Sequence, residues 1–171
     1  YVVPVQQAQF RLVHSIFAET PSIKGDVFYG STSYAIAPAY GVAFAGSRSR
    51  IDGGARVTAL PPLQGAVNGG QAGFAYAIDW RDYSAGRALA ALQAKGLSAR
   101  AAFKPFSSAT AQGQVDFAAG TLIIPVAGQP LQGAALFEAV SATARDAGVQ
   151  VHALSSGRSS EGIDLGSDGV K

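Results

Sequence analysis

Hydrophobic residues from position 74 onward occur in short continuous runs that alternate with stretches of helical spacing. Residues 83–95 and 131–147 place apolar side chains three and four positions apart, which predicts amphipathic helices. Gly96 and Gly148 follow these stretches and are expected to end the helices. The apolar runs between them are bounded by glycine or polar residues and predict buried strands. The predicted strands are residues 74–78, 97–103, 121–126 and 149–154.

Strands joined by helices need crossover connections, which give parallel strands with helices packed on the faces of the sheet. The near-continuous apolar run TLIIPV at 121–126 indicates a strand that is covered on both sides. The pattern therefore predicts an α/β fold, a three-layer sandwich with a mostly parallel sheet.

The first part of the chain fits the same plan. Residues 2–5 and 27–29 predict strands, and residues 9–18 predict a helix with an apolar face. Residues 33–41 predict a second short helix, in which Pro38 lies near the start or produces a kink.

Two segments are rich in turn-forming residues. Residues 46–73 contain many glycines and a Pro61-Pro62 pair, and we expect a hairpin there with edge strands at 55–60 and 65–67, since long loops without structure are uncommon. Residues 105–114 predict a loop.

Composition excludes several classes of function. Only 14% of the 171 residues are charged, and no apolar run reaches the length needed to span a membrane. The formal net charge is +2, and Arg48, Arg50 and Arg56 form the only loose basic cluster, so we expect no nucleic-acid partner. The absence of cysteine excludes disulfides, thiolate nucleophiles and sulfur-ligated metals.

A polar and aromatic cluster at 79–83 (DWRDY) follows a predicted strand and precedes a helix. Open α/β sheets bind ligands at the carboxyl ends of their strands, so Asp79 or Asp82 could contact a ligand and Trp80 could form an apolar wall. In the alternative interpretation, Asp82 or Ser84 caps the helix and Trp80 is a packing residue.

Three other predicted loops also follow strand ends: residues 6–7, 127–130 and 155–158. Because parallel strands end at one edge of a sheet, we expect these loops and residues 79–83 to line a common rim. The residues predicted to bind a ligand there are Gln6, Gln7, Asp79, Trp80, Asp82, Tyr83, Gly128, Gln129, Ser155 and Ser156.

The two ends of the chain indicate a piece of a larger protein. The chain begins with Tyr1 and contains no methionine, and residues 155–171 follow a predicted strand without any further predicted element. We expect residues 1–171 to form a single α/β domain or most of one.

Four runs of the chain are characteristic: YVVPVQQAQFRLVHSIF (1–17), DVFYGSTSYAIAPAYGVAFA (26–45), AYAIDWRDYSAGRALAALQAKGLSARAAFKPF (75–106) and HALSSGRSSEGIDLGSDGVK (152–171). They resemble a region found downstream of the catalytic domain in large bacterial proteins of the zinc carboxypeptidase family. Gly30 and Tyr34 depart from the pattern of that family, in which an acidic residue and a tryptophan are usual at these positions.

The resemblance implies a fold similar to class I glutamine amidotransferase domains, which are flavodoxin-like. It also implies a zinc-dependent peptidase domain upstream of residue 1, in the same chain, and a secreted or periplasmic location. Zinc is expected in that domain, and no cofactor is expected in the present segment.

The segment itself has no recognisable catalytic motif. His14 is followed by Glu19 five residues later, whereas a zinc site of this family has its glutamate three residues after the histidine, and His152 is the only other histidine. An active amidotransferase needs a cysteine nucleophile, which is absent. Neither a G-x-S-x-G serine motif nor a G-x-G phosphate motif occurs.

Three functions follow as hypotheses. The first is a non-catalytic accessory domain that stabilises or orients the peptidase domain. The second is a module that binds a peptide or a cell-wall fragment, and the third is a serine-based hydrolase.

Overall fold

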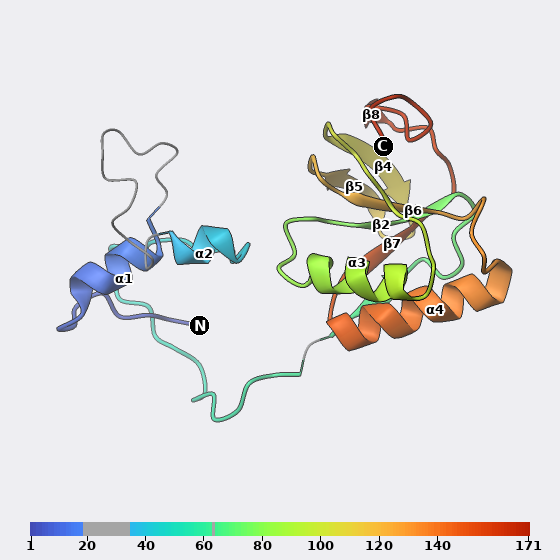
Figure 1. Ribbon diagram of the computed structural model, residues 1–171. Coiled ribbons are helices and arrows are strands. Elements are labelled where there is room, and N and C mark those ends of the chain that lie inside the picture. Colours follow the sequence, from blue (N-terminus) through green and yellow to red (C-terminus); the bar gives the residue numbers. More distant parts are fainter. Residues whose placement is uncertain (19–34, 63) are drawn as a thin grey trace, which may run out of the picture. The chain divides into compact units, whose positions relative to one another are not determined.

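The computed structural model describes residues 1–18, 35–62 and 64–171, which form two compact units (Figure 1). The first unit is Tyr1–Pro61 and the second is Pro62–Lys171. The second unit is a mixed α/β structure with a five-stranded sheet and a smaller three-stranded sheet.

The five-stranded sheet has the order β1-β7-β2-β6-β3. Only β1 and β7 pair in parallel, while β2 pairs antiparallel with β7 and with β6, and β6 pairs antiparallel with β3. The expectation of a mostly parallel sheet is therefore wrong, whereas the α/β class is confirmed. The strands are β1 (Ala66–Asn68), β2 (Ala75–Ile78), β3 (Arg100–Ala101), β6 (Leu122–Pro125) and β7 (Gln150–Leu154).

The sheet is mixed because two β-α-β units interleave. The first unit runs from β2 through α3 (Ala85–Ala94) to β3, and the second from β6 through α4 (Gly133–Ala147) to β7. Within each unit the two strands point the same way, as a crossover requires, but each pair is split by a strand of the other unit. This is a split β-α-β arrangement, as in ferredoxin-like folds. The hydrophobic pattern predicted the units correctly but did not contain the strand order.

Both helices end where the sequence predicted. Gly96 and Gly148 have φ values of 76° and 75°, a left-handed conformation that glycine adopts without strain. The helices are tied together by side chains as well: Arg87 donates a hydrogen bond to the carbonyl of Ala147, and Lys95 Nζ donates to Thr143 Oγ1 at 3.0 Å.

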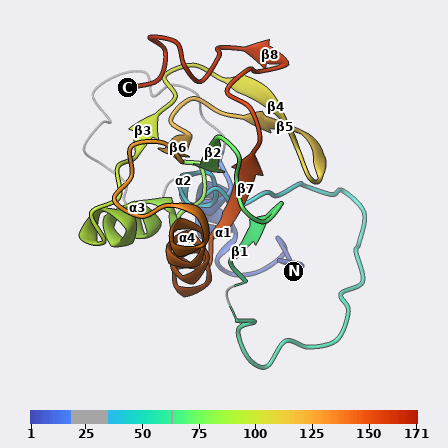
Figure 2. The same ribbon diagram turned by 90° about the vertical axis from the view of Figure 1, so that its right-hand side faces the viewer.

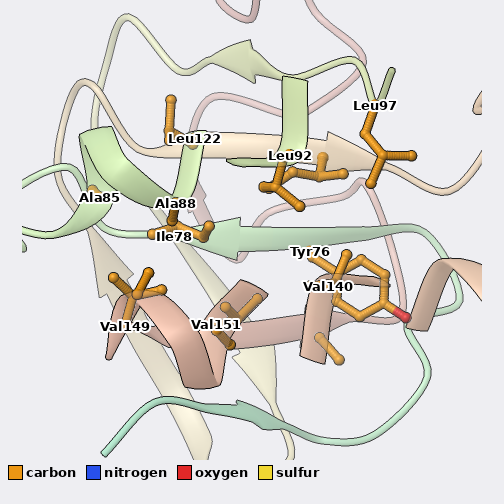
Figure 3. Packing of buried hydrophobic residues seen from close by; sticks show 14 of the residues in the cluster. Tyr76, Ile78, Ala85, Ala88, Leu92, Leu97, Leu122, Val140, Val149 and Val151 are labelled. Atoms are coloured by element: carbon orange, nitrogen blue, oxygen red, sulfur yellow. The ribbon is translucent and has the colours of Figure 1, made fainter. Parts of the chain in front are cut away.

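The two helices cover the same face of the large sheet (Figures 1 and 2). Tyr76 and Ile78 of β2 pack there against Leu92 of α3 and Val140 of α4 (Figure 3), and all four side chains are buried. The sheet is covered on both sides, but helices cover only one of them.

The opposite face is covered by the small sheet, whose order is β5-β4-β8. Phe106 and Phe117 stack with their ring centroids 4.8 Å apart and join the buried cluster that includes Ala77, Ile123 and Leu154. The prediction of a loop at 105–114 is therefore wrong. The segment is largely polar, but it forms most of a β-hairpin. The strands are β4 (Phe106–Thr110), β5 (Gly113–Phe117) and β8 (Glu161–Gly162).

Residues 155–171 also fold, contrary to the expectation that they contain no further element. Leu165 and Val170 are buried in the cluster beneath the small sheet. The last residues pair with β3: Ala101 N donates to Lys171 O at 2.7 Å, and Lys171 N donates to Ala101 O at 3.1 Å.

In the first unit, the described residues form α1 (Phe10–Ile16) and α2 (Ile36–Ala39). The helix predicted at 9–18 is confirmed, and α2 falls within the range predicted for a second helix, with Pro38 inside it. Residues 2–5 form no strand, and the strand predicted at 27–29 lies outside the described residues. Ala35 N donates to Ser15 O at 2.7 Å and so links the two helices.

The hairpin predicted within 46–73 is wrong. Residues 55–60 form no strand. The second predicted strand exists as β1, but it joins the edge of the large sheet in parallel with β7. No helix in the described parts of the chain is long and apolar enough to cross a membrane.

Candidate functional site

Strand direction separates the predicted site residues into two groups. Ala75, the first residue of β2, pairs with Pro125 near the end of β6 and with Leu154 at the end of β7. The loops after β6 and β7 therefore lie at the edge where β2 begins, whereas residues 79–83 follow the opposite end of β2. The expected convergence of these loops does not occur, because it required parallel strands.

Gln6 and Gln7 belong to the first unit. Gln7 Nε2 donates a hydrogen bond of 2.6 Å to Pro4 O, so its amide takes part in a local turn.

Asp79 is held by Arg81. Its carboxylate accepts hydrogen bonds from Arg81 N at 2.9 Å and from Arg81 Nε at 3.0 Å, and it forms an ion pair with the guanidinium. Burial alone raises the pKa of Asp79, but the hydrogen bonds and charge of Arg81, with a smaller contribution from His152, outweigh burial and lower it. Asp79 is thus a charged group whose main partner lies two residues away.

Asp82 organises the turn that leads into α3. Its Oδ1 accepts a hydrogen bond of 2.8 Å from Ser84 N, and its carbonyl accepts one of 2.9 Å from Ala85 N. Ser84 occupies the N-cap position, but its side chain makes no capping hydrogen bond. The structure therefore favours the structural interpretation of Asp82.

Trp80 and Tyr83 are exposed on the same turn. Trp80 lies against Gly120: a Cβ atom added to Gly120 would be 3.3 Å from Trp80 Cβ and 3.4 Å from Cδ1. The indole is thus partly a packing residue, and the rest of its surface is open to solvent.

His152 was not among the predicted ligand-binding residues, yet its charge contributes to the lowered pKa of Asp79. It lies on β7 opposite Ala77, and its ring meets Phe117 edge-on at a centroid distance of 5.6 Å. Burial lowers the pKa of His152. The charge of Asp79 has the opposite but smaller effect, so the pKa stays below its ordinary value. Its Nδ1 atom is buried without a hydrogen-bond partner among the described residues. Period-two alternation puts Asp79 on the face of Ala77, and the strand register places His152 opposite Ala77.

Gln129 is a buried structural clamp. Its Oε1 accepts from Ser98 N at 2.8 Å, and its Nε2 donates to Ser98 O at 2.8 Å and to Pro125 O at 2.9 Å. The amide therefore joins the loop after α3 to the end of β6. The neighbouring Gly128 forms the turn with a φ of 74°.

Ser155 borders a hollow of about 290 Å³. The turn between β1 and β2 and the tip of the β4–β5 hairpin form its other walls. Ser156 does not line this hollow; its Oγ accepts a hydrogen bond of 3.0 Å from Arg158 N. The next two serines donate to backbone carbonyls, Ser159 to Ile163 O at 2.7 Å and Ser160 to Ser107 O at 3.1 Å.

A second, shallower hollow of about 580 Å³ is lined by Phe74, just before β2, and by residues of the segment 157–167. Phe74 forms one wall, and Gly157 fits closely against it, since a Cβ atom on Gly157 would be 2.4 Å from Phe74 Cζ. Arg158 and Asp164 bring opposite charges to its rim.

Within the described residues, no group of three or more His, Asp or Glu side chains is arranged to hold a metal ion. Comparison of the chain with protein-family models, curated proteins and solved structures finds no match. The two hollows at the start of β2 are thus the candidate sites that the geometry offers, and the turn after β2 carries the ion pair of Asp79 with Arg81.

Proposed function

We propose that this chain is a non-catalytic accessory domain of a zinc carboxypeptidase-like protein. It stabilises or orients the peptidase domain of the same chain, in a secreted or periplasmic setting, and zinc and peptide hydrolysis belong to that other domain. The proposal keeps the accessory role implied by the sequence resemblance. It leaves out the parallel sheet of an amidotransferase, which the strand pairings contradict.

The exposed hydrophobic residues of the first unit carry the proposal. Among the described residues, Ala37 is the only buried hydrophobic residue before position 62. Large exposed apolar surfaces mark sites of interaction with other proteins or domains. A domain that contacts a peptidase domain needs such a surface. The exposed large hydrophobic residues of this unit are Tyr1, Val2, Val3, Val5, Phe10, Leu12, Tyr40, Val42, Ile51, Val57 and Leu60.

The use of polar groups in the second unit also supports a structural role. The amide of Gln129 is bound to two backbone segments, Asp79 is paired with Arg81, and Asp82 holds the turn before α3. Three residues predicted to contact a ligand thus stabilise loops of the domain itself.

The proposal is tested first on the reading frame that contains this chain. Upstream of Tyr1 it should encode an H-x-x-E motif and a distant histidine, the ligand set of a carboxypeptidase zinc site. A frame without these residues would refute the assignment to this family.

The second test measures association between the separately expressed peptidase domain and this chain by isothermal titration calorimetry. Phe10→Ser and Leu12→Ser, on the exposed surface of α1, should weaken association, since each removes apolar contact area. Phe103→Ser is the matched control, because Phe103 is 63% exposed in the second unit. Equal weakening by all three variants, or no association of the unmodified chain, would contradict the proposal.

A further inference from the structure

The hollow beside Ser155 has walls made mainly of backbone and small side chains. None of the residues that line it is ionisable, and its polar side chains are an amide and two hydroxyls. Its volume of about 290 Å³ is just below the range for ligand pockets, about 300 to 1,000 Å³. The lining residues are Gly69, Gln71, Ala72, Gly73, Ala109, Thr110, Ala111, Ala153, Leu154 and Ser155.

One wall of the hollow is a strand edge that pairs, near the hollow, with none of the described residues. Ser107 O accepts hydrogen bonds from Ser160 N at 2.8 Å and from Ser160 Oγ at 3.1 Å, so the carbonyl of Ser107 points away from β5. Backbone groups in a strand alternate with a period of two, and those of Ala109 therefore also point away from β5. The pairing of β8 with β4 ends at Ser107, so it does not reach Ala109.

The hollow lies on the side of β4 that faces away from β5. Three residues at the end of β4 and the hairpin tip line it, and no residue of β5 does. The N–H and C=O groups of Ala109 thus face the side on which the hollow lies.

The other walls come close to this edge because they lack bulk. A Cβ atom added to Gly69 would lie 3.3 Å from the Cβ atoms of both Ala111 and Ala153. Gly69 also has a φ of 97°, which glycine adopts without strain. The β1–β2 turn therefore forms one side of the hollow and Ala109 lines another, and we call the space between them the slot.

We propose that this slot binds an extended peptide segment with small, uncharged side chains, which pairs with the free edge of β4 in line with β8. Backbone hydrogen bonds to an exposed strand edge give such peptides their affinity, and the side-chain pockets give specificity. The volume of about 290 Å³ limits the total size of the side chains that enter, and the absence of ionisable lining residues disfavours charged ones. This binding activity goes beyond the accessory role and does not depend on it.

The first test uses acetyl-tetraalanine amide as the probe in an NMR titration of the ¹⁵N-labelled whole chain. The amide signals of Ala109, Ala111 and Ser155 should shift together and saturably, and exchange of the Ala109 N–H with solvent should slow. The same peptide with alternate amides N-methylated, so that it cannot donate to Ala109 O, should produce neither effect. Equal binding of the methylated peptide, shifts confined to other residues, or no shifts at all would overturn the proposal.

A pair of variants at one residue then tests the strand edge itself. Ala109→Pro removes the N–H that points toward the slot, and proline is tolerated at such edge positions. Ala109→Ser keeps the N–H and nearly the same size. We expect affinity to fall about tenfold in the proline variant, as for one lost hydrogen bond, and to stay within about twofold in the serine variant. Unchanged affinity in a folded proline variant would refute the pairing, and if that variant does not fold, the N-methylated peptide decides.

Discussion

The two units differ in whether the apolar stripe of a helix is buried. In the first unit, α1 and its C-cap place Phe10, Val13 and Phe17 at helical spacing, but no residue of α1 is buried. In the second unit, α3 has Ala85, Ala88 and Leu92 at the same kind of spacing, and all three are buried. An apolar stripe thus predicts a helix in both cases, but it does not say whether the covering surface belongs to the same unit.

The difference follows from what each helix can pack against. The second unit offers α3 a five-stranded sheet and a partner helix, α4. The described residues of the first unit contain two short helices and no strand. The second unit thus supplies its own core, whereas Ala37 is the only buried hydrophobic residue among the described residues of the first unit.

The largest effect should appear when the two units are made separately. Residues 62–171 should unfold cooperatively on heating, with dispersed NMR signals, because nearly all buried hydrophobic residues lie there. Residues 1–61 should show neither property. Cooperative unfolding of the isolated first unit, followed by circular dichroism, would remove the basis of the comparison.

The next effect compares two isoleucines. Ile123 of β6 is 2% exposed, and Ile123→Ala should cost about 2–5 kcal/mol of unfolding free energy. Ile51 is 55% exposed in the first unit, and Ile51→Ala should cost less than about 0.5 kcal/mol. Urea denaturation of both variants measures the difference, and similar costs would show that Ile51 also lies in a core.

A smaller effect should follow from loss of the Gln129 clamp. Gln129→Ala leaves Ser98 N, Ser98 O and Pro125 O without this partner, and we expect a cost of about 1–3 kcal/mol. Gln114 is exposed on β5, so Gln114→Ala is the control and should change stability by less than about 0.5 kcal/mol. If the two variants have equal stability in urea, Gln129 does not hold the loops together.

The smallest effect concerns pH. Burial lowers the pKa of His152 below its ordinary value of 6.5, and Asp79 restores it only in part. The unfolded chain therefore takes up a proton first as the pH falls below 6.5, so acidification destabilises the fold, and this contribution is fully recovered above that pH. His152→Gln should flatten the dependence of unfolding free energy on pH between about pH 7 and 5. An unchanged slope would show that His152 does not carry it.

The sequence predicted the two β-α-β units of the second unit because local signals suffice for them. The apolar runs and the helix-ending glycines at 96 and 148 predicted α3, α4, β2, β6 and β7. β6 is an inner strand, as its apolar residues required, and Pro125 is its last residue, where a missing donor is tolerated.

Strand order and the candidate site could not be predicted in the same way. Both depend on which strands pair, and each β-α-β unit is equally compatible with adjacent or interleaved strands. The assumed parallel sheet placed Asp79, Gln129 and Ser155 on one rim, whereas the actual pairings separate Asp79 from the other two. The β4–β5 hairpin was missed because only Phe106, Val115 and Phe117 mark its apolar face. The boundary near residue 61 lacks a composition signal, since both units are rich in apolar residues.

Hydrogen–deuterium exchange of the whole chain tests the central claim most directly, because it reports protection at each amide. In the chain alone, amides of β2, β6 and α4 should exchange slowly and those of α1 rapidly. On addition of the peptidase domain, α1 should become protected while the second unit stays unchanged. Slow exchange of α1 in the chain alone, to the same degree as α4, would contradict the account.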